Sequence, residues 1–189
     1  MIPDPQRELI PRSDTLRLIG VLDGMKAMYS DAAQQWRFLD DAGRVPASPS
    51  YPELIQHAVD AQALSHRVIR TTAEFARTIH STNRAGSAIL AHLATAATLS
   101  TYAAPRFAET AKTALSLSQT ASSTTRQYQE NSMVLDHATA RSYLRRTSES
   151  LHGAVKELDQ HLDLHRFFPA PSRPANPAPL PPKPSTHRL

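Results

Sequence analysis

Two histidines and a glutamate, each one helical turn apart, are the side chains of this sequence best placed to bind a metal ion. Glu157, His161 and His165 follow one another at intervals of four residues. On a helix they would project from one face, and carboxylate and imidazole ligands suit zinc and similar divalent ions. The structural alternative is that both histidines lie in the last turn of a helix, where an imidazolium is favoured by the helix dipole. His165 also continues an apolar row, so we predict no metal site and no cofactor.

Arginines could contact phosphates. Arg70, Arg77 and Arg84 repeat every seven residues and would form a line on one helix face, although Glu74 interrupts it. A second cluster, diluted by Glu149, consists of Arg141, Arg145 and Arg146. No helix-turn-helix or zinc-finger pattern accompanies these residues, and pairing with acidic residues of the preceding helix would explain the line equally well. Nucleic-acid binding is therefore the alternative interpretation, not the leading one.

The C-terminal segment is the third candidate for recognition chemistry. Residues 169–189 contain eight of the 15 prolines and no acidic side chain. Residues 166–189 carry the whole net charge of +4, because residues 1–165 hold 17 basic and 17 acidic side chains. Proline-rich chain samples polyproline II, and residues 179–183 form a PxxP core that aromatic grooves recognise. A merely solubilising end is the alternative. The candidate interaction residues are Arg173, Pro179, Pro182, Lys183 and Arg188.

Signatures of enzymes are missing from the sequence. There is no glycine-rich phosphate loop, no Gly-x-Ser-x-Gly elbow and no His-Glu-x-x-His motif, and only five glycines occur. The chain has no cysteine, which excludes thiolate catalysis and disulfides. We predict that the protein is not an enzyme and see no evident small-molecule substrate.

Regular apolar spacing predicts the helices that must position these groups. Ser13 and Asp14 are typical of a helix start, and Gly43 of the stop that follows. Apolar residues between them alternate at spacings of four and three, as helix pairing requires. They are Leu18, Leu22, Met25, Tyr29, Ala32, Trp36 and Leu39. Val21 and Met28 widen this face, which favours a bundle. For Trp36, core packing is the default interpretation and a binding hot spot the alternative.

Further helices are predicted along the rest of the chain. Ser50 and Glu53 form a capping box before a helix over residues 52–82. Residues 85–125 are rich in Ala, Ser and Thr, and Pro105 either starts a new helix there or kinks a long one. The next break is predicted at residues 130–132. A last helix over 134–165 carries a seam through Leu144, Ser148, Leu151, Val155, Leu158, Leu162 and His165.

The predicted fold is all-α, an elongated bundle of about four long, largely antiparallel helices with heptad-like seams. Its domains are a flexible leader (1–12), the bundle (13–168) and a disordered proline-rich basic tail (169–189). Residues 85–104 lack charge and could cross a membrane, but their Ser, Thr and His disfavour this.

We expect a non-enzymatic protein–protein interaction or scaffold protein, with a protein partner or self-association. A nucleic-acid-associated protein that uses the Arg rows and the tail is the alternative, and a membrane-associated one through residues 85–104 is a third class. The N-terminal residues lack the basic and apolar regions of a secretory signal, and a cytoplasmic location is expected.

Overall fold

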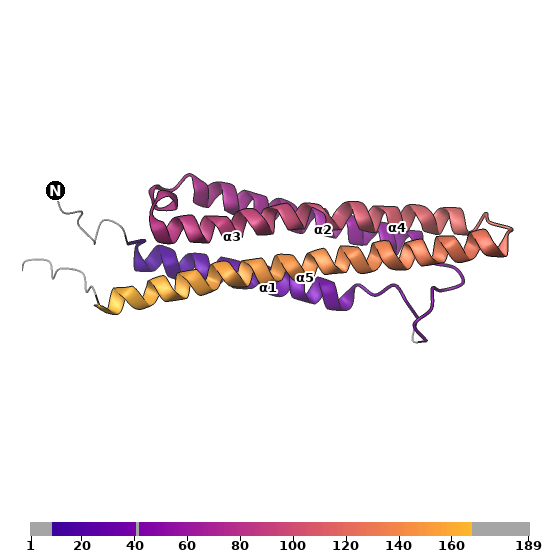
Figure 1. Ribbon diagram of the computed structural model, residues 1–189, viewed down its shortest axis with the longest axis horizontal. Coiled ribbons are helices and arrows are strands. Elements are labelled where there is room, and N and C mark those ends of the chain that lie inside the picture. The colour runs from indigo at the N-terminus through magenta and orange to yellow at the C-terminus, as the bar shows by residue number, and fades with distance from the viewer. Residues whose placement is uncertain (1–8, 41, 168–189) are drawn as a thin grey trace, which may run out of the picture.

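Five α-helices form an elongated bundle, and no strand occurs among the residues described. The computed structural model describes residues 9–40 and 42–167. The helices are α1 (Arg12–Gln35), α2 (Tyr51–Ala76), α3 (Arg84–Thr101), α4 (Ala103–Leu117) and α5 (Ser123–Phe167), with a short 3₁₀ helix, η2 (Ile79–Thr82), before α3. α3 and α4 run on in one direction as a single arm, so the chain passes up, down, up and down through four arms (Figure 1). The predicted four-helix bundle is confirmed.

α5 is the helix against which α1, α3 and α4 pack. Its 45 residues extend for about 68 Å at the usual rise per residue. It contacts α1 along one side and α3 and α4 along another. One row of buried residues, at spacings of four and three, consists of Met133, His137, Ala140, Leu144, Thr147, Leu151, Ala154, Leu158 and His161. Ser148 and Leu162, predicted in the seam, are only half-buried, because α5 is covered from two sides and its buried face is centred one residue earlier.

The first helix is shorter than predicted. α1 ends at Gln35, and Trp36 leaves the helical conformation with a ψ of 85°. Leu39 is therefore not on the helix seam and is 39% exposed, whereas Phe38 turns inward and is buried. Gly43, predicted as the helix stop, lies in the following loop with a φ of 73°, where glycine is the residue that adopts this conformation at no cost.

Other boundaries also differ from the prediction. α2 ends at Ala76 rather than near residue 82, because η2 intervenes. Ser50 occupies the N-cap position of α2, but its side chain makes no capping hydrogen bond. Pro105 lies in the first turn of α4, so it starts a helix rather than kinking one. The break predicted at residues 130–132 is wrong: the turn lies at residues 118–122, and α5 then runs without interruption.

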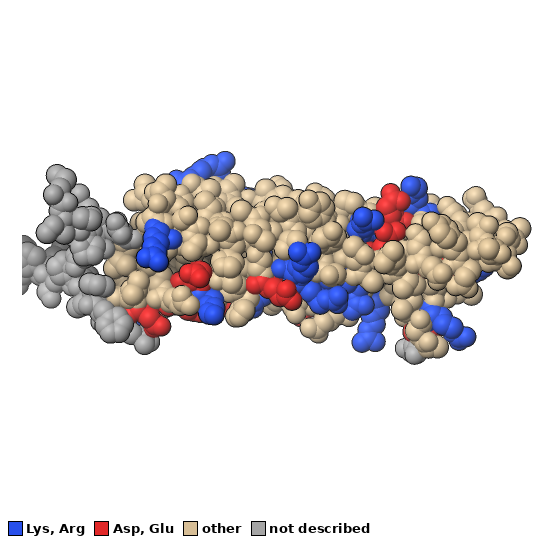
Figure 2. Space-filling model, viewed as in Figure 1, with Lys and Arg blue, Asp and Glu red and all other residues tan. Residues whose placement is uncertain are grey.

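The arm formed by α3 and α4 presents two kinds of surface. After Arg84, α3 carries no charged residue, and Figure 2 shows an uncharged surface over most of it. α4 carries a mixed group of charges, in which Lys112 pairs with Glu109 at 3.1 Å. Within residues 9–40 and 42–167, no helix is both long enough and apolar enough to cross a membrane.

The start of α3 fits tightly against η2. The Asn83 side chain accepts a hydrogen bond of 2.7 Å from the backbone N–H of Gly86 and so caps the helix. A Cβ atom on Gly86 would lie 1.8 Å from the backbone oxygen of His80. Gly24, within α1, would meet nothing within 4 Å.

These two glycines give opposite predictions for alanine substitution. Gly86→Ala should lower the free energy of unfolding by about 1–3 kcal/mol, because the η2 backbone must shift. Gly24→Ala should raise it by about 0.5–1 kcal/mol, since alanine is the better helix former. Thermal unfolding followed by circular dichroism measures both changes. A Gly86→Ala protein as stable as the original would contradict the close approach described above.

Candidate functional site

A groove runs between α1 and α2, which touch each other at only a few places. α1 packs chiefly on α5, and α2 on α3 and α4, so neither helix covers the other. Two hollows lie in series along this seam. One, of about 400 Å³, is lined by residues between Met28 and Trp36 of the first arm and between Asp60 and Arg67 of the second. The other, of about 220 Å³, lies towards Ile10 and Phe75.

Hydrogen bonds from α5 side chains hold α1 in place beside this groove. Arg141 Nε donates to the Ala33 carbonyl at 2.7 Å, and Ser148 Oγ donates to the Lys26 carbonyl at 3.1 Å. Burial lowers the pKa of Arg141, with Arg145 and Arg37 adding to the effect. α1 is thus held chiefly from the α5 side.

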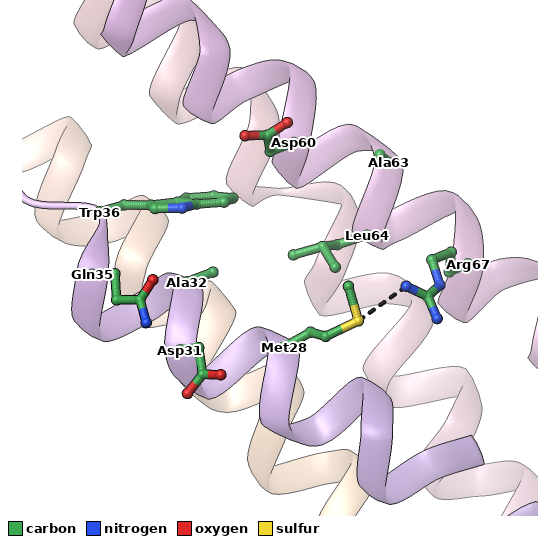
Figure 3. A pocket seen from close by; sticks show the side chains of 9 residues that line it. All are labelled: Met28, Asp31, Ala32, Gln35, Trp36, Asp60, Ala63, Leu64 and Arg67. Carbon is green, nitrogen blue, oxygen red and sulfur yellow. Dashed lines mark hydrogen bonds between the residues drawn. The ribbon is translucent and has the colours of Figure 1, made fainter.

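Methionine sulfurs make the direct side-chain bonds that cross the groove. Arg67 Nη1 donates to Met28 Sδ at 2.9 Å, as Figure 3 shows, and Thr71 Oγ1 lies 4.0 Å from Met25 Sδ. Thioether sulfur is a weak acceptor on a flexible side chain, so these contacts constrain the width of the groove only weakly.

Apolar side chains of α1 that a closely packed α2 would cover line the groove. Val21 and Met28, which widen the apolar face in the sequence, are 46% and 39% exposed and line the smaller and the larger hollow respectively. The wide apolar face predicted for the first helix is real, but α2 leaves part of it uncovered. Exposed apolar side chains in a concave surface are typical of binding grooves.

Trp36 forms one end of the larger hollow. In Figure 3 its indole lies across the end of the groove, opposite Leu64 and beside Asp60. Its ring stacks on that of His57, with centroids 5.1 Å apart and planes 6° apart, and meets Phe107 edge-on at 5.4 Å. Trp36 is half-buried: it packs on the core, as expected, and also lines the groove. Its role as a binding hot spot stays a prediction.

Acidic side chains line both hollows that Trp36 borders. Asp31 and Asp60 line the larger hollow from opposite helices, and Arg67 is the one basic residue in that lining. Beyond the indole, Glu53 lines a shallower hollow with Asp60, Pro52, Gln56 and His57. Arg37 lines a neighbouring hollow with Glu53 and His57. An aromatic ring with Asp60 beside it and further carboxylates in the adjoining hollows suits an apolar or proline-containing segment that carries positive charge.

A buried cluster of rings supports Trp36 from behind. His137 of α5 is 3% exposed and lies 5.2 Å from Phe107, 5.3 Å from Phe38 and 5.9 Å from His57, measured between ring centroids. Burial, assisted by the neighbouring His57 and Arg141, lowers the pKa of His137 to about 4. Burial also lowers the pKa of His57, against the opposing carboxylates of Asp60 and Glu53. These rings therefore pack in their neutral form at neutral pH.

The histidines singled out as metal ligands bind the N-terminal backbone. His161 Nε2 accepts a hydrogen bond of 2.9 Å from the Ile10 N–H, and His165 Nε2 lies 2.8 Å from the Ile10 carbonyl, to which it must donate. Burial lowers the pKa of His161, and the nearby His165 and His80 add to this. Among the residues that the structure describes, no three His, Asp or Glu side chains are grouped to hold a metal ion.

The other predicted recognition residues are not brought together. Arg77 is the C-cap of α2, and Arg84 begins α3, so η2 breaks the predicted line. Arg70 pairs with Glu74 of its own helix at 3.7 Å, not with α1. Arg173, Pro179, Pro182, Lys183 and Arg188 lie outside the described residues.

Most of the groove has no signature in the sequence. Its residues from α2, including Asp60, Leu64 and Arg67, show no motif in the sequence. Two features of the sequence pointed to the groove: the single tryptophan, and the apolar face of the first helix, which is wider than one seam requires.

Comparison with known proteins adds no assignment. No family model matches the chain, and neither curated proteins nor solved structures include a significant match. The function must be argued from the groove itself.

Protonation of the buried histidines should make stability depend on pH. The folded pKa of His137 is about 4 and the unfolded value is 6.5, so below pH 6.5 the unfolded chain binds the extra proton. Stability from this group is complete above pH 6.5 and is lost as pH falls towards 4, by up to about 3 kcal/mol. Urea titrations across this range measure the loss. His137→Leu should flatten the profile, whereas the exposed His66→Leu should leave its slope unchanged; equal slopes in all three proteins would contradict this assignment.

The Ile10 contact gives a separate, local prediction. His161→Leu removes the acceptor of the Ile10 N–H, which should speed exchange of that amide about 3–10-fold, the equivalent of one net hydrogen bond. Hydrogen exchange read by NMR measures it. The exposed His152→Leu serves as control, and unchanged Ile10 exchange in His161→Leu would show that the bond contributes nothing.

Proposed function

We propose that the protein is a non-catalytic interaction module that binds an extended segment of a protein partner in the groove between α1 and α2. The observation that carries this proposal is that two neighbouring helices are each anchored elsewhere and leave apolar side chains exposed between them. A groove that ends on a tryptophan offers the kind of aromatic anchor that dominates many interfaces. The cysteine-free chain is compatible with a reducing compartment, and we place this activity in the cytoplasm.

The charge around Trp36 supports a cationic ligand. Asp31, Asp60 and Glu53 outnumber Arg67 in the two hollows beside the indole. Phosphates would be repelled there, which argues against a nucleic acid as the occupant of this groove. An extended peptide with an apolar stretch followed by Lys or Arg satisfies both the ring and the carboxylates.

Selection of displayed peptides on the full-length chain tests this proposal. We expect the selected peptides to combine proline or large apolar residues with a basic residue. Asp60→Lys should weaken their binding about tenfold or more, equivalent to about 1.4 kcal/mol. The control is Asp159→Lys, an exposed change of the same kind on α5, outside the groove lining, which should leave affinity unchanged.

Trp36 provides the direct measurement, because it is the only tryptophan in the chain. Peptide binding should shift its fluorescence. Peptides that bind without moving the Trp36 signal, or that bind Asp60→Lys as tightly as the original, would overturn the groove as the binding site.

A further inference from the structure

We propose that residues 179–183 of this chain's own C-terminal segment occupy the Trp36 end of the groove, and so compete with a protein partner. This rests on the proposed function, since it assigns an occupant to the same groove. Three observations carry it: where the described chain ends, how far the remaining residues reach, and how their charges match the groove.

The described chain ends beside the far end of the groove. α5 ends at Phe167, two residues after His165, whose ring contacts the Ile10 carbonyl at 2.8 Å. Ile10 itself lines the smaller hollow. In Figure 1 the end of α5 lies beside the start of α1. The following 22 residues therefore start near one mouth of the groove, and a path along the groove would bring them to Trp36.

The length of that segment matches the length of the groove. From Ile10 to Trp36 the helical rise gives about 39 Å. In polyproline II, the conformation favoured by such proline content, Pro179 lies about 37 Å and Lys183 about 50 Å beyond Phe167. The PxxP core of residues 179–182 therefore reaches the indole when the segment follows α1 directly.

Charge fits this register. Arg17 lines the smaller hollow together with Asp14 and Glu74. Arg67, the basic side chain of the larger hollow, lies before Trp36 and would face residues 174–178, which are uncharged. Lys183 would pass the indole and arrive at the shallower hollow lined by Glu53 and Asp60. A cation there lies near two carboxylates, which attract it. A segment shifted towards Phe167 by one turn would bring Lys183 no closer to these carboxylates.

The chemistry of the Trp36 end also suits proline. Proline rings pack on flat aromatic faces, and a polyproline segment loses little conformational entropy on binding because it is already extended. Beside the indole, Ala32, Ala63 and Leu64 provide a shallow apolar lining. Tethering raises the effective concentration to the order of 1 mM, so a segment with a Kd of about 100 μM would fill the groove in about nine molecules of ten.

The test compares full-length proteins that differ only in the segment. P179A/P182A/K183A removes the PxxP core and its cation, and P169A/P171A is the matched control that removes two prolines near α5. The single Trp36 indole N–H signal in a ¹H–¹⁵N spectrum reports the groove without any partner. We expect the signal to move in the first variant and to stay in place in the second. A signal common to all three proteins would overturn the proposal.

Further measurements separate the possible outcomes. A peptide of residues 177–189, added in trans, should bind P179A/P182A/K183A about tenfold more tightly than the original chain, where the tethered segment competes. Asp60→Lys should abolish that binding. If the Trp36 signal of the original chain depends on protein concentration, the occupant is a second copy and the assignment within one chain is wrong.

Failure of this proposal and failure of the proposed function give different results. If selected peptides bind the original chain and P179A/P182A/K183A equally and through Asp60, the groove is a binding site but the segment does not fill it. If neither the tethered segment nor any selected peptide moves the Trp36 signal, the groove is not a binding site at all.

Discussion

Burial of one continuous face of α5 is the constraint on which the rest of the structure depends. Leu144, Leu151 and Leu158 are fully buried and stand at the centre of a face that α1 covers from one side and the α3–α4 arm from the other. In a protein, most of a helix's stability comes from the packing of its apolar face rather than from helix propensity, and α5 has 45 residues to place. α1 and the α3–α4 arm are placed by where they can cover that face, and α2 packs on the α3–α4 arm.

The groove follows from this arrangement. α1 and the α3–α4 arm together cover the apolar face of α5, and α2 packs on the α3–α4 arm. The burial of these faces therefore does not require α1 to pack against α2. The contacts across that seam are correspondingly weak, with methionine sulfur as the acceptor. At the end of the seam, Trp36 closes the gap by stacking on His57, and buried rings of α4 and α5 support it. The groove is thus firm at the indole and adaptable along its length.

Apolar periodicity predicted the all-α class and the bundle. Spacings of four and three identify a helix and its buried face even when the predicted first and last residues of the helix are wrong. Helix boundaries were less predictable, because they depend on contacts between distant residues. α1 ends at Gln35, where Trp36 and Phe38 turn into the bundle. The sequence of residues 36–42 contains no signal that predicts a helix end at this position. The unbroken α5 was missed because Asn131 and Ser132 are weak helix formers, and packing on α4 overrides that preference.

The candidate site was predictable only in fragments. Trp36 stood out as the lone tryptophan, but its partners Asp60 and Leu64 belong to another helix and acquire meaning only when the two helices are placed side by side. His161 and His165 were correctly seen to share a helix face. Their ligand could not be foreseen, because it is the backbone of Ile10, more than 150 residues away in sequence.

Main-chain atoms supply the α1 side of the hydrogen bonds that tie this helix to α5. Arg141 and Ser148 bind carbonyl groups of Ala33 and Lys26, and His161 binds the backbone N–H of Ile10 just before the helix. Such bonds are indifferent to which side chains α1 carries. In evolutionary terms, the attachment of the helix is therefore uncoupled from the chemistry of its groove-facing residues. Mutations there could drift towards new ligands while the scaffold keeps its hold on α1.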